Sequence, residues 1–305
     1  GTGLGVYSPG TAYVLLHHAR GDVDGNVGSW GCARGGMGSV AAALSSSFLS
    51  FGGTIRKSSE VKKIIVSNQT ATGVELVSGE IINAKAIISN LDAKRTFLKI
   101  IDESDLPEDI VKRAKNFKIR GSSGKVNIAL DGMPIFPALP EKSPLTLGHM
   151  HFSDTLERLE RAYDDWKDDR WSSDPYGERV IPTQYDPTMA PPGKHMMSVF
   201  VQYCPVSPEG GWDDKKKKAF GDTVINQIGD YSPNFKDLIL HAEIRTPHEI
   251  EKEVGLTEGN IFQGELTLDQ LMFNRPFPGY AQYRGPLKRM YMCSSSNHPG
   301  GGVMG

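Results

Sequence analysis

The sequence has little cysteine, no long apolar run and no visible secretion signal. Its three cysteines, Cys32, Cys204 and Cys293, lie far apart in 305 residues, which argues against a disulfide framework and fits a reducing compartment. No apolar stretch approaches the roughly 20 residues that a membrane-spanning helix needs. We therefore expect no transmembrane segment, while peripheral contact with a membrane stays open.

The chain also lacks an excess of either charge. Its formal net charge is −2, whereas domains that bind nucleic acid carry a basic footprint, so no nucleic-acid partner is predicted. The one basic run, Lys215–Lys218, follows Asp213 and Asp214 and is typical of a solvated helix start. No two cysteines have the spacing of a metal site, and no metal ligands are predicted.

The hydrophobic periodicity predicts an α+β fold with a mixed sheet. A short helix or buried strand is expected at Ala12–Leu16, and Ser39–Ser50, rich in small residues, indicates a closely packed helix that ends at Gly52-Gly53. Further helices are expected at Leu106–Asn116, Lys215–Tyr231 and Pro247–Val254, and a charged helix or a pair of turns is expected at 153–170. Strands are expected at Val61–Ser67, Gly73–Val77, Glu80–Ile82, Ala84–Ser89, Lys125–Leu130, Val180–Pro182, His195–Tyr203, Leu238–Arg245 and Met290–Cys293.

Three glycine-rich segments are candidates for cofactor binding. Gly1–Gly5 is interpreted as a plain loop, because no strand precedes it and its spacing is not G-x-G-x-x-G. Ser294–Gly305 has three consecutive glycines after a strand. Such a loop lets backbone N–H groups approach a flat ring or a pyrophosphate, but a flexible tail explains it equally well. The turn Arg34–Gly38 precedes a helix and by itself favours ordinary packing on a sheet.

Taken together and in order, several segments resemble phytoene-dehydrogenase-like flavoproteins. The similarity is greatest to the pyridine nucleotide-disulphide oxidoreductase domain-containing proteins of that group, and it extends over essentially the whole chain. The segments that carry it are GGMGSVAAAL, GGTIRKSSEVKKI, GVELVSGEIINAKAIISNLDAKRTFLKI, GNIFQGELTLDQLMFNRP and YMCSSSNHPGGGVMG.

The resemblance implies a fold and a division into domains. It implies an amine-oxidase-like, two-domain flavoprotein, of which this chain is the C-terminal two-thirds without the N-terminal Rossmann unit. Residues 34–100 and 286–305 are then parts of a discontinuous FAD-binding domain. Residues 1–33 and 101–285 form the substrate domain, whose mixed sheet includes His195–Tyr203.

The resemblance also implies cofactor-binding residues. Val61 would reach the adenine through its backbone, the turn Gly35, Gly36 and Met37 would lie near the flavin ring, and the last loop would wrap the flavin and its ribityl chain. That loop contributes Ser295, His298, Gly301, Gly302 and Val303. Ser294 departs from the family, which often has glycine there. No catalytic residue follows. His17 and His18 are candidates for the substrate side, although a structural role fits each histidine better.

The function implied is that of an FAD-dependent oxidoreductase, a desaturase or dehydrogenase acting on a hydrophobic small molecule. The alternatives are a non-catalytic flavoprotein-like scaffold or regulator, and a fragment inert by itself. This chain alone is expected to be inactive and to hold FAD weakly or not at all. The compartment would be the cytoplasm in a bacterium or the mitochondrion in a eukaryote. The sequence predicts neither the oligomeric state nor the electron acceptor.

Overall fold

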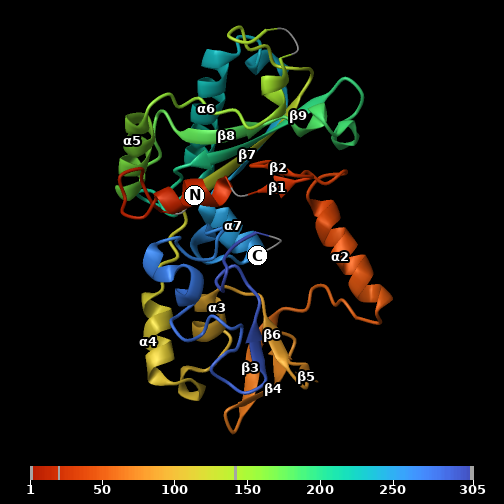
Figure 1. Ribbon diagram of the computed structural model, residues 1–305, viewed down its shortest axis with the longest axis vertical. Helices are drawn as coiled ribbons and strands as arrows, with labels where there is room; N and C mark the ends of the chain where they lie inside the picture. Colours follow the sequence, from red (N-terminus) through yellow and green to blue (C-terminus); the bar gives the residue numbers. More distant parts are fainter. Residues whose placement is uncertain (1–2, 20, 141–142, 303–305) are drawn as a thin grey trace. The chain divides into compact units, whose positions relative to one another are not determined.

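The computed structural model describes residues 3–19, 21–140 and 143–302, and its internal contacts divide these residues into two units. Unit 1 is formed mainly by Gly5–Ile55 and Ser122–Glu249, and unit 2 mainly by Arg56–Gly121 together with the chain from Ile250 onward. Figure 1 labels most of the helices and strands of both units. No helix in the described ranges is long and apolar enough to span a membrane.

Unit 1 is built on a four-stranded sheet in the order β10-β7-β9-β8. Its strands are β7 (Ser123–Leu130), β8 (Tyr176–Val180), β9 (His195–Gln202) and β10 (Ile239–Arg245). The strand predicted around residues 195–203 is confirmed, and it lies in the interior of the sheet. The strand predicted at 180–182 is β8 and lies a few residues earlier, because Pro182 starts a 3-10 helix instead.

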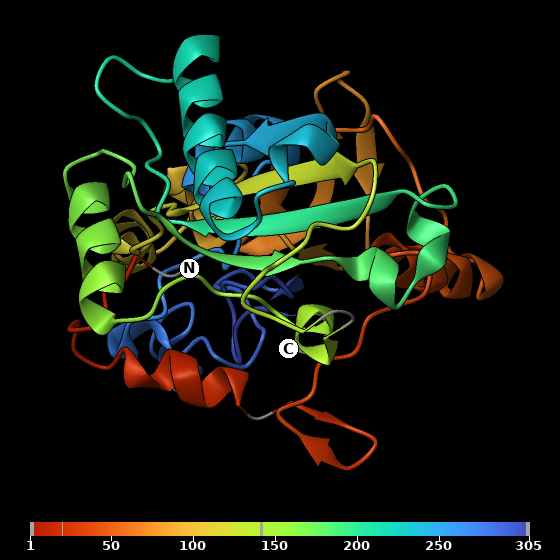
Figure 2. The same cartoon turned by 90° about the horizontal axis from the view of Figure 1, so that it is seen from above.

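Helix α6 (Asp214–Tyr231) covers one face of this sheet (Figures 1 and 2). The helix begins where the Asp213 side chain accepts a hydrogen bond from the Lys216 N–H at 2.7 Å, which satisfies one of the free donors of the first turn. Because side chains alternate along a strand, every second residue points at α6. The buried cluster that results contains Val126, Ile128, Leu130, Met197, Val199, Val201, Phe220, Val224 and Ile228.

The sheet differs from the mixed sheet expected from the sequence, because all three of its strand pairings are antiparallel. The reason lies in the connections. Strands β9 and β10 are joined through α6 and run in the same direction, but β7 lies between them and opposes both. Strands β9 and β10 are therefore not neighbours in the sheet, because β7 is inserted between them, and no parallel pairing forms. The α+β class itself is confirmed.

The rest of unit 1 surrounds the sheet with short elements. The first, α1 (Ala12–His18), resolves the choice left open at Ala12–Leu16 in favour of a helix. Helix α2 (Gly38–Ser50) is also confirmed, but none of its residues is buried. The close packing predicted for it is therefore wrong for the described chain, because no described element covers its small residues. The others are α5 (Leu156–Lys167), β1 (Asp22–Val23) and β2 (Asn26–Val27).

Unit 2 contains the predicted antiparallel meander, β3 (Val61–Ser67), β4 (Thr70–Leu76) and β5 (Ile81–Asn83). Asn68 and Gln69 close its first hairpin with φ of 48° and 58°, values typical of a two-residue hairpin turn. Strand β6 (Ile87–Ser89) instead pairs in parallel with β11 (Met290–Met292), about 200 residues later in the chain.

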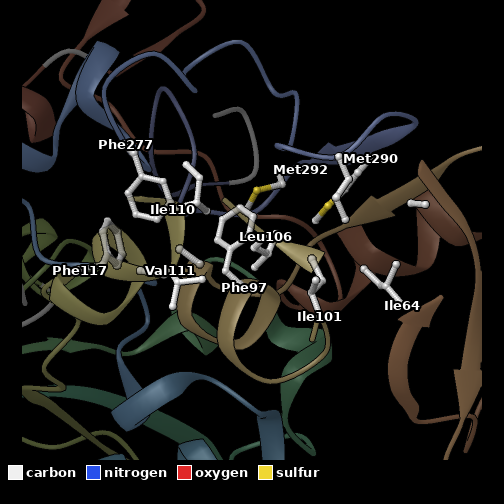
Figure 3. Close-up of a cluster of buried hydrophobic side chains, with 14 of the residues drawn as sticks. Ile64, Phe97, Ile101, Leu106, Ile110, Val111, Phe117, Phe277, Met290 and Met292 are labelled. Carbon is white, nitrogen blue, oxygen red and sulfur yellow. The ribbon is translucent and has the colours of Figure 1, made fainter. Parts of the chain in front are cut away.

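The core of unit 2 lies between these strands and two helices, α3 (Ala93–Leu98) and α4 (Glu108–Asn116). Figure 3 shows Ile110 and Val111 of α4 near Phe97, with Phe117 and Phe277 beside them. Helix α7 (Pro247–Val254) spans the boundary between the units in sequence. Short 3-10 helices lie at Glu103–Asp105, Pro144–Leu147, Pro182–Gln184, Pro187–Met189, Lys236–Leu238, Thr257–Gly259, Leu268–Gln270 and Met272–Asn274.

The two units follow the chain differently from the domains expected from the resemblance. Residues 34–55 group with unit 1, whereas 101–121 and 250–285 group with unit 2. The units describe contacts within this chain, while the expected domains describe which parts hold a cofactor in the whole protein. The division into an FAD-binding and a substrate domain therefore stays a prediction.

The packing of α6 on β10 gives a matched pair of glycine variants. A Cβ at Gly221 would lie 2.6 Å from Cγ1 of Ile244, whereas one at Gly229 would meet only the flexible side chain of Lys236. Alanine in a helix gains about 1 kcal/mol over glycine, but overpacking costs about 1–3 kcal/mol. Urea unfolding should therefore show Gly229→Ala stabilised and Gly221→Ala destabilised. Equal stabilisation of both would contradict this contact between α6 and β10.

Candidate cofactor site

The predicted glycine-rich loop, residues 294–302, follows β11 directly. The Cys293 N–H donates to the Ser89 carbonyl at 2.9 Å, continuing the β6–β11 pairing into the loop. Asn297 then closes a turn, because its Nδ2 donates to the carbonyl and to Oγ of Ser294 at 3.2 and 3.0 Å. The hydroxyl of Ser294 is thus engaged within the loop.

A second loop, residues 257–265, is tied to the first through the start of α3. The Asp92 carboxylate accepts hydrogen bonds from the Arg95 N–H at 2.9 Å and from Oγ1 of Thr257 at 2.8 Å. Ser296 accepts from the Ala93 N–H at 3.0 Å and donates to the Gln263 carbonyl. Two loops and one helix end are therefore fixed against one another in unit 2.

Arg275 binds the backbone of both loops. Its side chain is fully buried. Its Nε donates to the Ser295 carbonyl at 2.7 Å, and its Nη atoms donate to four carbonyls at 2.6–3.3 Å. These four belong to Phe262, Gly264, Glu265 and Gln270. A planar guanidinium with five N–H donors suits this role, because loops without secondary structure leave many carbonyls to satisfy.

Three buried polar atoms on these loops have no hydrogen-bond partner among the described residues. They are Oε1 of Gln263, Oδ1 of Asn297 and Nδ1 of His298. The His298 ring stacks on Phe273, with centroids 5.3 Å apart and an interplanar angle of 13°. Buried polar atoms are seldom left unpaired in native proteins. The two loops therefore present acceptor atoms suited to a ligand that carries hydroxyl or N–H donors.

The glycines of the loop differ in backbone conformation and in the space available for a side chain. Gly300 and Gly302 have φ of 121° and 103°, a region that strongly favours glycine. Gly301 is different, because a Cβ there would make ordinary contacts at 3.5 Å with Phe262 and Ser295. The chain's own structure therefore explains glycine at 300 and 302 but leaves glycine at 301 unexplained.

The predicted turn Arg34–Gly38 lies in unit 1, and a residue about 150 positions later in the chain holds it in place. The Gly35 N–H donates to Oδ2 of Asp186 at 2.6 Å, and Gly35 and Gly36 have φ of 83° and 86°. The Thr188 hydroxyl and then the Gly35 N–H hold the pKa of Asp186 below its usual value. Met37 is exposed.

The structure thus places the predicted site residues in two units. Gly35, Gly36 and Met37 belong to unit 1, whereas the rest of the described set, Val61, Ser295, His298, Gly301 and Gly302, belongs to unit 2. Of these, the loop 294–302 brings the last four together. Val61 lies at the start of β3. The side chains of His17 and His18, and Val303, lie outside the described residues. No observation tests the predicted roles, which stay predictions.

Sequence reasoning missed the residues that hold the site together. No sequence pattern assigned a role to Asp92, Gln263, Asp186 or Arg275. The signal at Asp92 was local, because an aspartate three residues before Arg95 in Asp-Ala-Lys-Arg has the spacing of an N-cap. Arg275 gave no such signal, since its partners are backbone carbonyls up to 20 residues away.

Arg275→Met should destabilise unit 2 strongly. The change leaves five buried carbonyls without this donor, and each unsatisfied buried group costs about 1–3 kcal/mol, so the free energy of unfolding should fall by more than about 3 kcal/mol. Arg275→Lys should recover only part of it, because an ammonium cannot reproduce the planar fork. The control Arg284→Met, at an exposed position, should change stability by less than about 0.5 kcal/mol. Urea unfolding measures all three, and similar losses for Arg275→Met and Arg284→Met would contradict the role of Arg275.

Glu258, within the second loop, predicts a pH dependence. Burial raises the pKa of this carboxyl above its ordinary 4.5, and Lys94 offsets this only in part. Above pH 4.5 the folded state then binds more protons than the unfolded state, so the contribution of Glu258 to stability is lost as pH rises through the folded pKa. Glu258→Gln should therefore gain in melting temperature relative to the natural chain between about pH 4 and 7.

Glu243→Gln provides the control of opposite sign. Arg245 and then Asn127 lower the pKa of Glu243 below 4.5, so its contribution is present above pH 4.5 and is lost as pH falls. This variant should lose melting temperature relative to the natural chain as pH rises. Slopes of the same sign for both variants would show that the environment of Glu258 is wrongly assigned.

Comparison with known proteins agrees with the resemblance found in the sequence. No protein-family model matches the chain. Pyridine nucleotide-disulfide oxidoreductase domain-containing protein 2 of Rattus norvegicus is 38% identical over 309 residues, which cover 98% of this chain and 53% of that protein. Phytoene desaturase of Phycomyces blakesleeanus is 24% identical, over 99% of this chain and 50% of its own length.

A solved structure supports the fold. The crystal structure of an oxidoreductase from Methanosarcina mazei superposes with a TM-score of 0.54 at 19% identity, covering 87% of this chain and 50% of that one. The chain spans about half the length of the curated relatives it matches. Its sequence is thus similar to that of pyridine nucleotide-disulfide oxidoreductase domain-containing protein 2 and, at lower identity, to phytoene desaturase and prolycopene isomerase.

Proposed function

We propose that the whole protein is an FAD-dependent dehydrogenase or desaturase and that loops 257–265 and 294–302 hold the flavin end of its cofactor. One observation carries the proposal. A loop with three consecutive glycines leaves a parallel strand, and buried polar atoms of Gln263, Asn297 and His298 around it have no partner among the described residues. Acceptors and exposed backbone are what a flavin ring and its ribityl hydroxyls need.

The residues of this chain would each contribute in a definite way. The carbonyl oxygens of Asn297 and Gln263 would accept hydrogen bonds from the cofactor, and Gly301 would let the backbone approach it closely. Arg275 would fix both loops before binding, so that little conformational entropy is lost when the cofactor binds. When bound, FAD supplies the ring that accepts a hydride from the substrate.

We also propose the division of the whole protein that the resemblance implies, with 34–100 and 286–305 in the FAD-binding domain. The parallel pairing of β6 with β11 supports it, because it joins two parts of that domain across the intervening chain. The helix start tied to loops 257–265 and 294–302 is that of α3, which has six residues, whereas a pyrophosphate is usually held by the N-terminus of a longer helix together with a glycine-rich turn. This supports weak FAD binding by the present chain alone.

Gly301 tests the proposal, because the chain itself has room for a side chain there. In the full-length protein, Gly301→Val should fold normally but bind flavin about 5- to 150-fold more weakly and retain less of it through purification, since overpacking against a ligand costs about 1–3 kcal/mol and 1.4 kcal/mol is tenfold in affinity. Circular dichroism and absorbance of the purified protein measure fold and flavin content.

Gly148→Val is the matched control. Gly148 lies in a loop of unit 1 where a Cβ would meet no atom within 4 Å and φ is −93°, so this variant should keep its flavin. A folded Gly301→Val protein with a full complement of flavin would remove the loop from the cofactor site.

A further inference from the structure

The second face of the sheet of unit 1 carries several polar side chains among apolar ones. Opposite the apolar face under α6, its strands present Lys125 and Asn127 of β7, Ser198 of β9 and Glu178 of β8. The register aligns Arg245, Lys125, Phe200 and Glu178 in one row across all four strands. We call this set of residues the polar face.

Lys125 lies inside the polar face and differs from its charged neighbours. Its Nζ donates to Oγ of Ser198 at 2.5 Å, and no carboxylate of a described residue lies within ion-pair distance of it. The other charges of the row have partners. Arg245 pairs with Glu243 at 2.8 Å, and Glu178 pairs with His149 at 3.4 Å.

The row explains why Glu178 does not neutralise Lys125. The two residues are on β8 and β7 with β9 between them, and two strand spacings amount to roughly 10 Å. Phe200 occupies the position between them. The nearest cross-strand neighbour on the other side, Arg245, is itself a cation. Lys125 therefore faces an apolar ring and a like charge.

This placement makes the ammonium costly. Burial lowers the pKa of Lys125 below its ordinary 10.5, and the charge of Glu178 offsets the effect only in part. A partly desolvated cation without an ion pair is stabilised by an anion from outside the chain. A solvated polar face, the usual state of an antiparallel sheet, would instead leave the lysine hydrated.

We propose that Lys125 binds the carboxylate of an amphipathic substrate, with Ser198 as a second polar contact and Phe200 packing against its apolar part. The claim that this ligand is the substrate rests on the proposed function. The claim that Lys125 binds a carboxylate does not. It refines the hydrophobic substrate expected from the sequence to an apolar body that carries one negative charge.

Calorimetric titration of the full-length protein with benzoate, and with benzyl alcohol as its neutral counterpart, tests the proposal. Benzoate should bind the natural protein, and Lys125→Met should weaken it about 10- to 100-fold, the loss of one charge-assisted hydrogen bond. Lys125→Arg should keep most of the affinity. The control Lys194→Met removes an exposed lysine that already pairs with Asp131 and should change nothing, and benzyl alcohol should not distinguish the variants.

A second measurement needs no variant. Benzoate should protect Lys125, but not Lys194, from acetylation by acetic anhydride, as read by mass spectrometry of the natural protein. Absence of benzoate binding, equal affinity in Lys125→Met, or equal protection of both lysines would overturn the proposal. Flavin content measured on the same samples separates the two claims. A protein without flavin that still binds benzoate through Lys125 keeps the anion site and loses the proposed oxidoreductase function.

Discussion

The loops of unit 2 depend on one buried guanidinium. Arg275 donates to five backbone carbonyls, drawn from Phe262–Gln270 and from Ser295, and these segments form no strand that could satisfy their carbonyls through a ladder. Its hydrogen bonds therefore take the place of secondary structure. They hold the glycine-rich loop against the second loop and leave the acceptors of Asn297 and Gln263 unpaired. A site prepared in this way loses little conformational entropy on binding.

Unit 1 follows a different principle, in which the alternation of side chains along strands gives one sheet two roles. The face under α6 is mostly apolar and supplies the core of the unit, with the buried Arg179 bound to Gln227 of α6. The opposite face carries charge in a fixed register, because a slip of one residue in any strand would exchange the two faces. The position of Lys125 between Arg245 and Phe200 is thus a consequence of the same pattern that buries Val126.

Elements with a strong period could be predicted from the sequence, and long-range contacts could not. Strand β3 and helix α7 were predicted at their observed bounds, because alternation and helix-start signals are local. The small residues of α2 predicted a closely packed helix, yet none of its residues is buried. Helix formation depends on the local sequence, whereas burial depends on a second element that packs against the helix. The antiparallel order of the four-stranded sheet escaped prediction because strand insertion leaves no local trace. Within the site, the glycine run was visible, whereas the residues that fix it, Asp92 and Arg275, act through partners far away in sequence.

Similarity to phytoene-desaturase-like proteins and the geometry of unit 2 support one central proposal, that the loop after β11 belongs to a flavin site. The most direct measurement is the absorbance spectrum of the full-length protein, purified with added FAD and then reduced without oxygen. The account predicts flavin absorbance bands that correspond to about one cofactor per chain. These bands should be bleached on reduction, because the cofactor carries the redox chemistry. A folded full-length protein with no flavin absorbance after incubation with FAD would contradict it.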